Sequence, residues 1–225
     1  DQGWTVGDVG DNASTGIWTR VDPFGTGAQP EDDNSEPGTL CFVTGQGTPY
    51  PGGFLGENDV DNGKTTLKSP TFDLSGKDGV IRYALWFSNN AGATPGTDKM
   101  TISISNNNGS SWTVMDTVKK SHIDWVTQQL VVSQFVTPTA QMKVRFVASD
   151  LGAGTLLESG VDDFKVFSFA LNQVPVLDPI SNKSVNEDST LALRVHAVDA
   201  DPDTVALTAE NVPANAVFID SGNGA

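Results

Sequence analysis

The sequence predicts an all-β protein built from β-sandwiches, and three observations lead to this prediction. The 225 residues include 23 Gly and 12 Pro, with many Ser, Thr, Asn and Asp, which are the residues that form turns. Long segments rich in Ala, Leu, Glu and Lys, which are typical of helices, are missing. Several segments instead alternate apolar and polar residues with the period of two that a half-buried strand requires.

The alternation is clearest in residues 80–88, 99–105 and 141–148, which we predict to be strands. The turn sequence at 106–110, Asn-Asn-Asn-Gly-Ser, predicts a hairpin after the second of them. Residues 124–135 are rich in β-branched side chains, so we interpret them as strand and loop rather than helix. The predicted inward faces consist of Ile81, Tyr83, Leu85, Phe87, Met100, Ile102, Ile104, Met142, Val144, Phe146 and Ala148.

A boundary between two modules is expected near residue 170. Residues 171–175 are polar and end in Pro175, as expected of a linker. Beyond it, alternation at 189–198 and apolar runs at 205–208 and 217–219 predict strands of a second sandwich. Residues 176–225 supply about half of what such a domain needs, so we expect a partial module with sheet edges that a neighbouring chain completes.

Composition and motifs exclude several function classes. Lys and Arg number 13 against 28 Asp and Glu, a net charge of −15 that argues against a nucleic-acid partner. No apolar segment approaches the roughly 20 residues of a membrane span. The single cysteine, Cys41, lies in an apolar run and is expected in the core. His122 and His196 show no zinc-site spacing, and His122 beside Asp124 lacks a nucleophile, so we predict a non-catalytic chain.

Seven segments of the first module resemble a known family. They are residues 16–26 (GIWTRVDPFGT), 29–33 (QPEDD), 38–45 (GTLCFVTG), 58–63 (NDVDNG), 66–70 (TLKSP), 104–112 (ISNNNGSSW) and 161–164 (VDDF). They are similar to the jelly-roll modules appended to secreted bacterial enzymes, notably at the C-termini of zinc carboxypeptidases. The likeness to MAM-type and carbohydrate-binding jelly rolls is more distant. The resemblance implies a jelly-roll module over residues 1–170 and a secreted bacterial protein.

The second module resembles cadherin-like and bacterial immunoglobulin-like repeats of surface proteins. The resemblance rests on the linker at 172–176 (NQVPV), the segment 185–188 (VNED) and the acidic loop at 197–203 (AVDADPD). It implies a partial cadherin-like or Ig-like sandwich over residues 176–225, with a calcium site in which Glu187 joins Asp199, Asp201 and Asp203.

Acidic loops of the first module also suggest calcium. Dense carboxylates beside Gly or Asn repel one another unless a cation or several donors lie among them, and calcium accepts six to eight oxygens in irregular loops. Solvated turns are the alternative interpretation. In a strand Asp162 and Asp163 point to opposite faces, so one of the two is the expected ligand. The candidate ligands here are Asp32, Asp33, Asp59, Asp61 and Asp162.

Aromatic and basic side chains suggest a saccharide site. Trp86 lies on the polar face of its predicted strand beside Arg82, where an outward ring would stack on a sugar. Lys143 and Arg145 form a basic strip suited to an acidic polysaccharide. The alternative is that Trp86 is covered by a loop. Other candidate platforms are Trp18, Tyr50 and Trp125.

Taken together, the sequence predicts a calcium-stabilised extracellular or cell-surface module for carbohydrate binding or adhesion. A rival prediction is an ancillary region of a secreted metallopeptidase whose catalytic domain lies outside this chain. A third is a structural spacer of a surface assembly. The predicted partner is a polysaccharide or cell-surface glycan.

Overall fold

A computed structural model describes residues 2–49, 51–152, 154–201 and 204–222. The chain divides into two compact units, residues 1–170 and 171–225. The described residues form strands and one 3-10 turn, η1 (Val132–Gln134), and no α-helix. None of them lies in a helix with the length and apolar character needed to cross a membrane.

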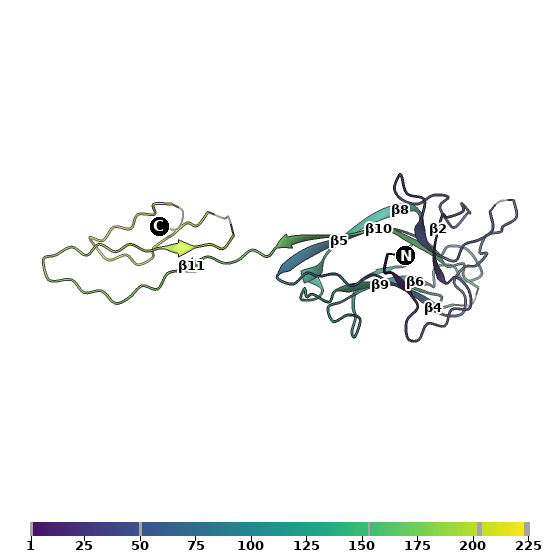
Figure 1. Cartoon of the computed structure of the whole chain (residues 1–225), viewed down its shortest axis with the longest axis horizontal. Coiled ribbons are helices and arrows are strands. Elements are labelled where there is room, and N and C mark those ends of the chain that lie inside the picture. The colour runs from purple at the N-terminus through teal and green to yellow at the C-terminus, as the bar shows by residue number, and fades with distance from the viewer. Residues whose placement is uncertain (1, 50, 153, 202–203, 223–225) are drawn as a thin grey trace. The chain divides into compact units, whose positions relative to one another are not determined.

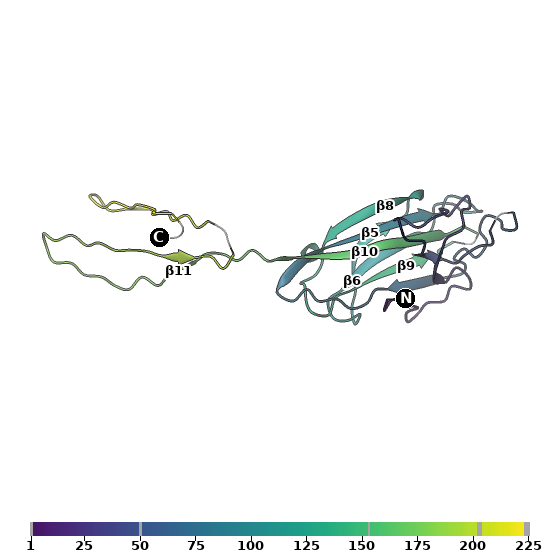
Figure 2. The same cartoon turned by 45° about the horizontal axis from the view of Figure 1, so that its top comes forward.

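Unit 1 (residues 1–170) is a β-sandwich of two five-stranded antiparallel sheets, which lie face to face in Figures 1 and 2. Successive strands alternate between the sheets over much of the chain, so neighbours within a sheet are often distant in sequence. The first sheet has the order β1 (Thr5–Val6), β4 (Lys64–Lys68), β9 (Lys143–Ser149), β6 (Lys99–Ser105) and β7 (Thr113–Val118). The second sheet has the order β2 (Trp18–Val21), β3 (Cys41–Thr44), β10 (Glu158–Ala170), β5 (Lys77–Ser88) and β8 (His122–Val131).

The core between the sheets is the one that the alternation predicts. Every side chain predicted to face inward from residues 80–88, 99–105 and 141–148 is fully buried. Tyr83 of β5 meets Phe146 of β9 edge to face, with ring centroids 5.1 Å apart. Alternate side chains of a strand point to opposite faces. A shift of one residue in the register of these strands would therefore move this whole set out of the core. The all-β sandwich prediction is confirmed.

Local turn chemistry is also as predicted. The hairpin between β6 and β7 contains Asn108 and Gly109 with φ of 56° and 90°, a left-handed geometry that Asn and Gly tolerate. The Ser110 N–H donates to the carbonyl of Asn107 and closes this turn. Residues 122–131 form β8 and residues 132–134 the turn η1, as expected of a β-branched segment.

A second, smaller core lies on the outer face of the second sheet and corrects the interpretation of Trp86. Trp86 does point away from the main core, but it has no exposed surface and packs with Cys41, Val43 and Trp125. The segment between β2 and β3 reaches this face, where the carbonyl of Asp32 accepts a hydrogen bond from the Trp125 ring N–H. The prediction of an outward sugar-stacking platform at Trp86 is therefore wrong, because a loop covers the outer face.

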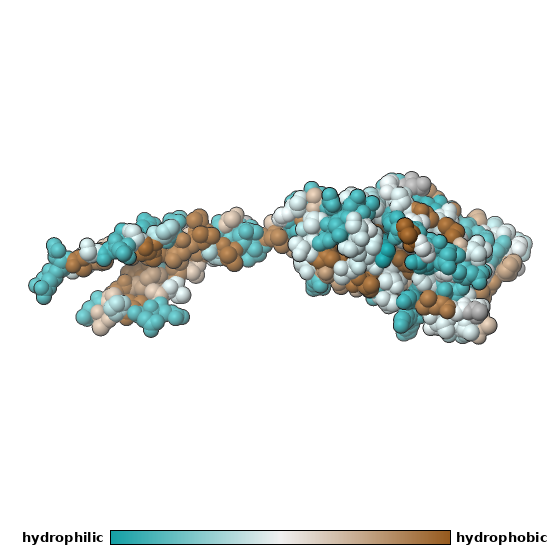
Figure 3. Space-filling model, turned by 90° about the horizontal axis from the view of Figure 1, so that it is seen from below, coloured by the Kyte–Doolittle hydropathy of each residue, from teal (hydrophilic) through white to brown (hydrophobic). Residues whose placement is uncertain are grey.

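Unit 2 (residues 171–225) contains less regular structure than the alternation predicts. Its assigned strands in the described residues are β11 (Val176–Leu177) and β12 (Ala197–Val198), which pair with each other. Residues 189–196, 205–208 and 217–219 form no assigned strand. Leu191 and Leu193 remain 48% and 47% exposed, so the described part of the unit covers only about half of each residue. Figure 3 shows hydrophobic side chains on the surface of this unit.

Candidate functional site

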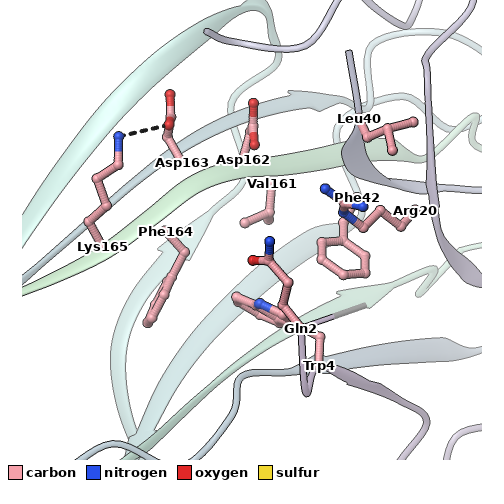
Figure 4. Close-up of a pocket in the computed structure, with 10 residues that line it drawn as sticks. All are labelled: Gln2, Trp4, Arg20, Leu40, Phe42, Val161, Asp162, Asp163, Phe164 and Lys165. Carbon is pink, nitrogen blue, oxygen red and sulfur yellow. Dashed lines mark hydrogen bonds and ion pairs between the residues drawn. The ribbon is translucent and has the colours of Figure 1, made fainter. Parts of the chain in front are cut away.

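A groove opens between the two sheets of unit 1, on the side where β1 and β2 form the sheet edges. A hollow of about 240 Å³ is lined by residues of the N-terminal segment, β2, β3 and β10 (Figure 4). An adjoining hollow of about 450 Å³ shares Trp4, Arg20 and Phe42 with it and extends toward Trp18. The larger of the two volumes falls in the usual range of small-molecule sites, and the smaller lies just below it.

Trp4 forms the aromatic floor of the groove. Its ring lies 5.3 Å from that of Phe42 and 5.2 Å from that of Phe164, edge to face with the latter. These contacts fix the ring on the core while part of its surface stays accessible. Gln2 and Arg20 line the same hollow and are exposed, so the floor has a rim of hydrogen-bond donors. Trp18, an alternative platform in the sequence analysis, is only 3% exposed and donates its ring N–H to the Thr65 carbonyl.

A bulge in β10 sets the direction of the two neighbouring carboxylates. The pairing of β10 with β5 shifts between Asp162 and Lys165, and Asp163 has a φ of 49°. Both carboxylates therefore reach Asn34, whose backbone N–H donates to Asp162 and whose amide donates to Asp163. In Figure 4 both point away from Trp4 and Phe42. The expectation that they face opposite sides is wrong, because the bulge interrupts the alternation.

The Asp32–Asp33 loop meets these carboxylates. Burial raises the pKa of Asp33, and the negative charges of Asp162 and Asp32 raise it further. Burial likewise raises the pKa of Asp162, against the hydrogen bond from Asn34. Burial acts to raise the pKa of Asp163 as well, but hydrogen bonds from Asn34 and Lys165 outweigh it and lower that pKa. Asn34 thus supplies donors within this predicted calcium site, and none of its described carboxylates has a buried oxygen without a partner.

The Asp59–Asp61 segment behaves differently. Asp59 is 5% exposed and its Oδ2 atom has no hydrogen-bond partner among the described residues. The structure brings to it two buried acidic residues that the sequence analysis did not select, Asp98 and Glu158. Asp98 precedes β6 and Glu158 begins β10, and only the tertiary fold brings them near Asp59. Acidic oxygens without partners fit the expectation of a cation better here than at Asp33.

The predicted calcium ligands of unit 2 are not assembled by the contacts of the described residues. Asp199 accepts a hydrogen bond from the Asp201 backbone N–H at 2.9 Å, and Asp201 accepts one from the Gln173 backbone. Glu187 is exposed and stands outside these contacts. Asp203 lies outside the described residues, as does the candidate platform Tyr50. A calcium site in this unit stays a prediction.

The predicted ligand-binding cations occupy two different sheets and are largely engaged. Arg82 of β5 lies over the ring of Phe167, 5.0 Å from its centroid. On β9, Arg145 donates to Asp8 at 3.1 Å and stacks on Trp112 at 4.5 Å, while Lys143 is half-buried. Arg82 and Arg145 therefore do not form one site with each other or with the buried Trp86.

His122, the histidine considered for a catalytic role, contacts the backbone of its own strand. The Nδ1 atom of His122 lies 3.4 Å from the backbone carbonyl oxygen of Asp124, not from its carboxylate. The Cys41 thiol is buried, and burial together with the charges of Asp162 and Asp33 raises its pKa, which keeps it in the unreactive thiol form.

No protein-family model matches the sequence, and no curated protein matches it either. Solved structures similar to this chain include the K1 cleaved adhesin domain of Lys-gingipain from Porphyromonas gingivalis W83, at 14% identity and a TM-score of 0.44, over 76% of this chain and 92% of that one. Another is TmCBM61 in complex with β-1,4-galactotriose, at 13% identity and a TM-score of 0.39, over 73% and 87%. A third is a cyclase from Fischerella sp. TAU, at 9% identity and a TM-score of 0.44, over 76% and 87%. These similarities concern a shared type of fold, and such folds host many functions.

Proposed function

We propose that unit 1 is a non-catalytic binding module that takes a saccharide in the groove between β1 and β2. The observation on which the proposal depends is the partly exposed ring of Trp4, held in place by Phe42 and Phe164 and flanked by exposed Gln2 and Arg20. A fixed aromatic face with polar groups beside it is the arrangement that stacks on a sugar ring and donates hydrogen bonds to its hydroxyls.

The charge around the groove favours a neutral or weakly charged saccharide. Burial raises the pKa of Asp162, and the nearby guanidinium of Arg20 offsets part of that increase. Asp162 therefore balances part of the positive charge of Arg20 at this edge of the groove, which leaves Arg20 as a hydrogen-bond donor rather than an anion trap. An adhesion role and an extracellular or cell-surface location belong to the same proposal.

Titration of the full chain with a panel of oligosaccharides, followed by calorimetry and tryptophan fluorescence, tests the proposal. Arg20→Ala and Trp4→Leu should each weaken binding by about tenfold or more, the usual effect of removing a central contact. Arg82→Ala is the matched control, since this arginine lies over Phe167 and not in the groove. Because Trp4 packs on the core, Trp4→Phe and a melting curve separate lost stacking from lost folding.

The proposal fails if no saccharide of the panel binds at millimolar concentration. It also fails if Arg82→Ala weakens binding as much as Arg20→Ala, because the ligand would then occupy another face.

A further inference from the structure

One end of the unit 1 sandwich gathers five carboxylates from four parts of the chain. Asp59 and Asp61 precede β4, Asp98 precedes β6, Asp150 follows β9, and Glu158 begins β10. The strand pairing explains why they meet: Ser149 at the end of β9 pairs with Lys64 on one side and with Lys99 on the other. The segment before Glu158 is tied to the segment after Asp59, because the Val60 N–H donates to the carbonyl of Leu157.

Three of the five carboxylates are buried. Asp59, Asp98 and Glu158 are 5%, 0% and 4% exposed. Asp59 Oδ2 and Asp98 Oδ2 find no hydrogen-bond partner in the described part of the chain. The other oxygen of Asp98 accepts the Leu151 N–H at 2.8 Å, and Glu158 accepts a bond from the Gly56 backbone. A buried carboxylate oxygen without a partner costs free energy, so each of these two oxygens needs an explanation.

The charges of the cluster are not balanced by protein cations. Over the described ranges, no Lys or Arg forms an ion pair with any of the five. The cluster therefore gathers negative charges at one end of the sandwich, and no ion pair among the described residues offsets them.

We propose that this cluster binds a divalent cation, with Asp59, Asp98 and Glu158 as the carboxylate ligands and Asp61 and Asp150 at its rim. Calcium suits the cluster because it takes oxygen ligands only and accepts irregular loop geometry, whereas magnesium demands a near-ideal octahedron. No three acidic, His or Cys side chains of the described residues converge as a preformed metal centre. Binding therefore draws the carboxylates together, and backbone carbonyls and water supply the remaining oxygens.

Calcium titration of the chelator-treated full chain tests this proposal. Calorimetry should show one saturable calcium ion per chain at the cluster, and the tryptophan-detected melting temperature should rise by about 5–10 °C at one hundred times the dissociation constant. All five tryptophans lie within residues 1–170, so their fluorescence reports on unit 1 alone. Magnesium at equal concentration should give a smaller shift.

Isosteric variants separate a metal ligand from a structural residue. Asp98→Asn and Asp59→Asn should each lower calcium affinity by about tenfold or more, since each loses a charged ligand. Without metal, both should melt at or above the wild-type temperature, because a neutral amide replaces an unpaired buried charge. A purely structural role of these carboxylates predicts the opposite sign in the metal-free protein.

Asp33→Asn is the matched control, since Asp33 lies in the other acidic cluster of the unit, where Asn34 supplies donors. It should keep the affinity and the melting shift. The proposal is overturned if calcium leaves the melting temperature unchanged, as expected of a cluster that shares protons instead. It is also overturned if Asp33→Asn abolishes binding while Asp98→Asn preserves it. Neither result depends on whether the groove binds a saccharide.

Discussion

Gly160 of unit 1 should tolerate alanine poorly, because a methyl group there would collide with a buried side chain. It lies in β10, paired with Trp86 of β5 on one side and Val43 of β3 on the other. A Cβ atom at this position would lie 2.2 Å from Trp86 Nε1 and 2.7 Å from Cε2, where real contacts essentially never fall below 3.0 Å. The indole would have to move by most of an ångström, and its fully buried site leaves no free space for that movement.

The expected cost follows from this overlap. Overpacking of a tight core costs about 1–3 kcal/mol, and alanine in place of a strand glycine with room to spare stabilises by about 0.4–1 kcal/mol. We therefore expect Gly160→Ala to lower the free energy of unfolding of unit 1 by about 1–2 kcal/mol. At 2–4 °C per kcal/mol for a domain of this size, its melting temperature should fall by about 2–8 °C.

Guanidinium unfolding followed by tryptophan fluorescence measures this change. Gly47→Ala is the control, since a Cβ there meets only ordinary contacts at 3.6 Å or more. A double-mutant cycle adds the sharper test: in a Trp86→Phe background the smaller ring should remove much of the cost of Gly160→Ala. Equal costs in both backgrounds, or a Gly160→Ala effect within 0.5 kcal/mol of Gly47→Ala, would refute the argument.

Two further predictions concern the rest of the chain. Asp8 accepts hydrogen bonds from Lys68 and Arg145 at 3.2 and 3.1 Å; burial acts to raise its pKa, but the Val9 N–H and these two cations lower it on balance. The stabilisation that Asp8 gives unit 1 is therefore present above the unfolded-state pKa and is lost as the pH falls through the lower folded-state pKa. Asp8→Asn should destabilise the unit by about 1 kcal/mol at pH 7 and by less in acid. Denaturation of both proteins at the two pH values measures this difference. In unit 2, amides near Leu191 and Leu193 should exchange hydrogen much faster than those of β5 and β9, because residues 189–196 form no assigned strand. Protection that rises with protein concentration would support completion by a neighbouring chain, and full protection in a dilute monomer would contradict it.

Local patterns in the sequence determined much of unit 1. The period-two alternation of residues 80–88, 99–105 and 141–148 specified which side chains enter the main core, because a strand allows only two faces. The Asn-Gly turn specified the β6–β7 hairpin, since few other residues adopt its left-handed backbone. The same alternation predicted less of unit 2, where apolar residues such as Leu191 remain exposed.

Only the tertiary structure decided the sites. Alternation placed Trp86 on the outer face of its strand, but whether that face meets solvent depended on a loop that precedes it by about 50 residues in sequence. The bulge at Asp163 turned two carboxylates to one side, and a bulge depends on pairing between strands rather than on local propensity. Asp59 and Asp98 meet because β4 and β6 lie on either side of β9 in the first sheet, and Glu158 joins them from β10 of the second sheet. These residues are far apart in sequence, so their proximity could not be predicted from it. Their burial and mutual charge repulsion arise only because the fold brings them together.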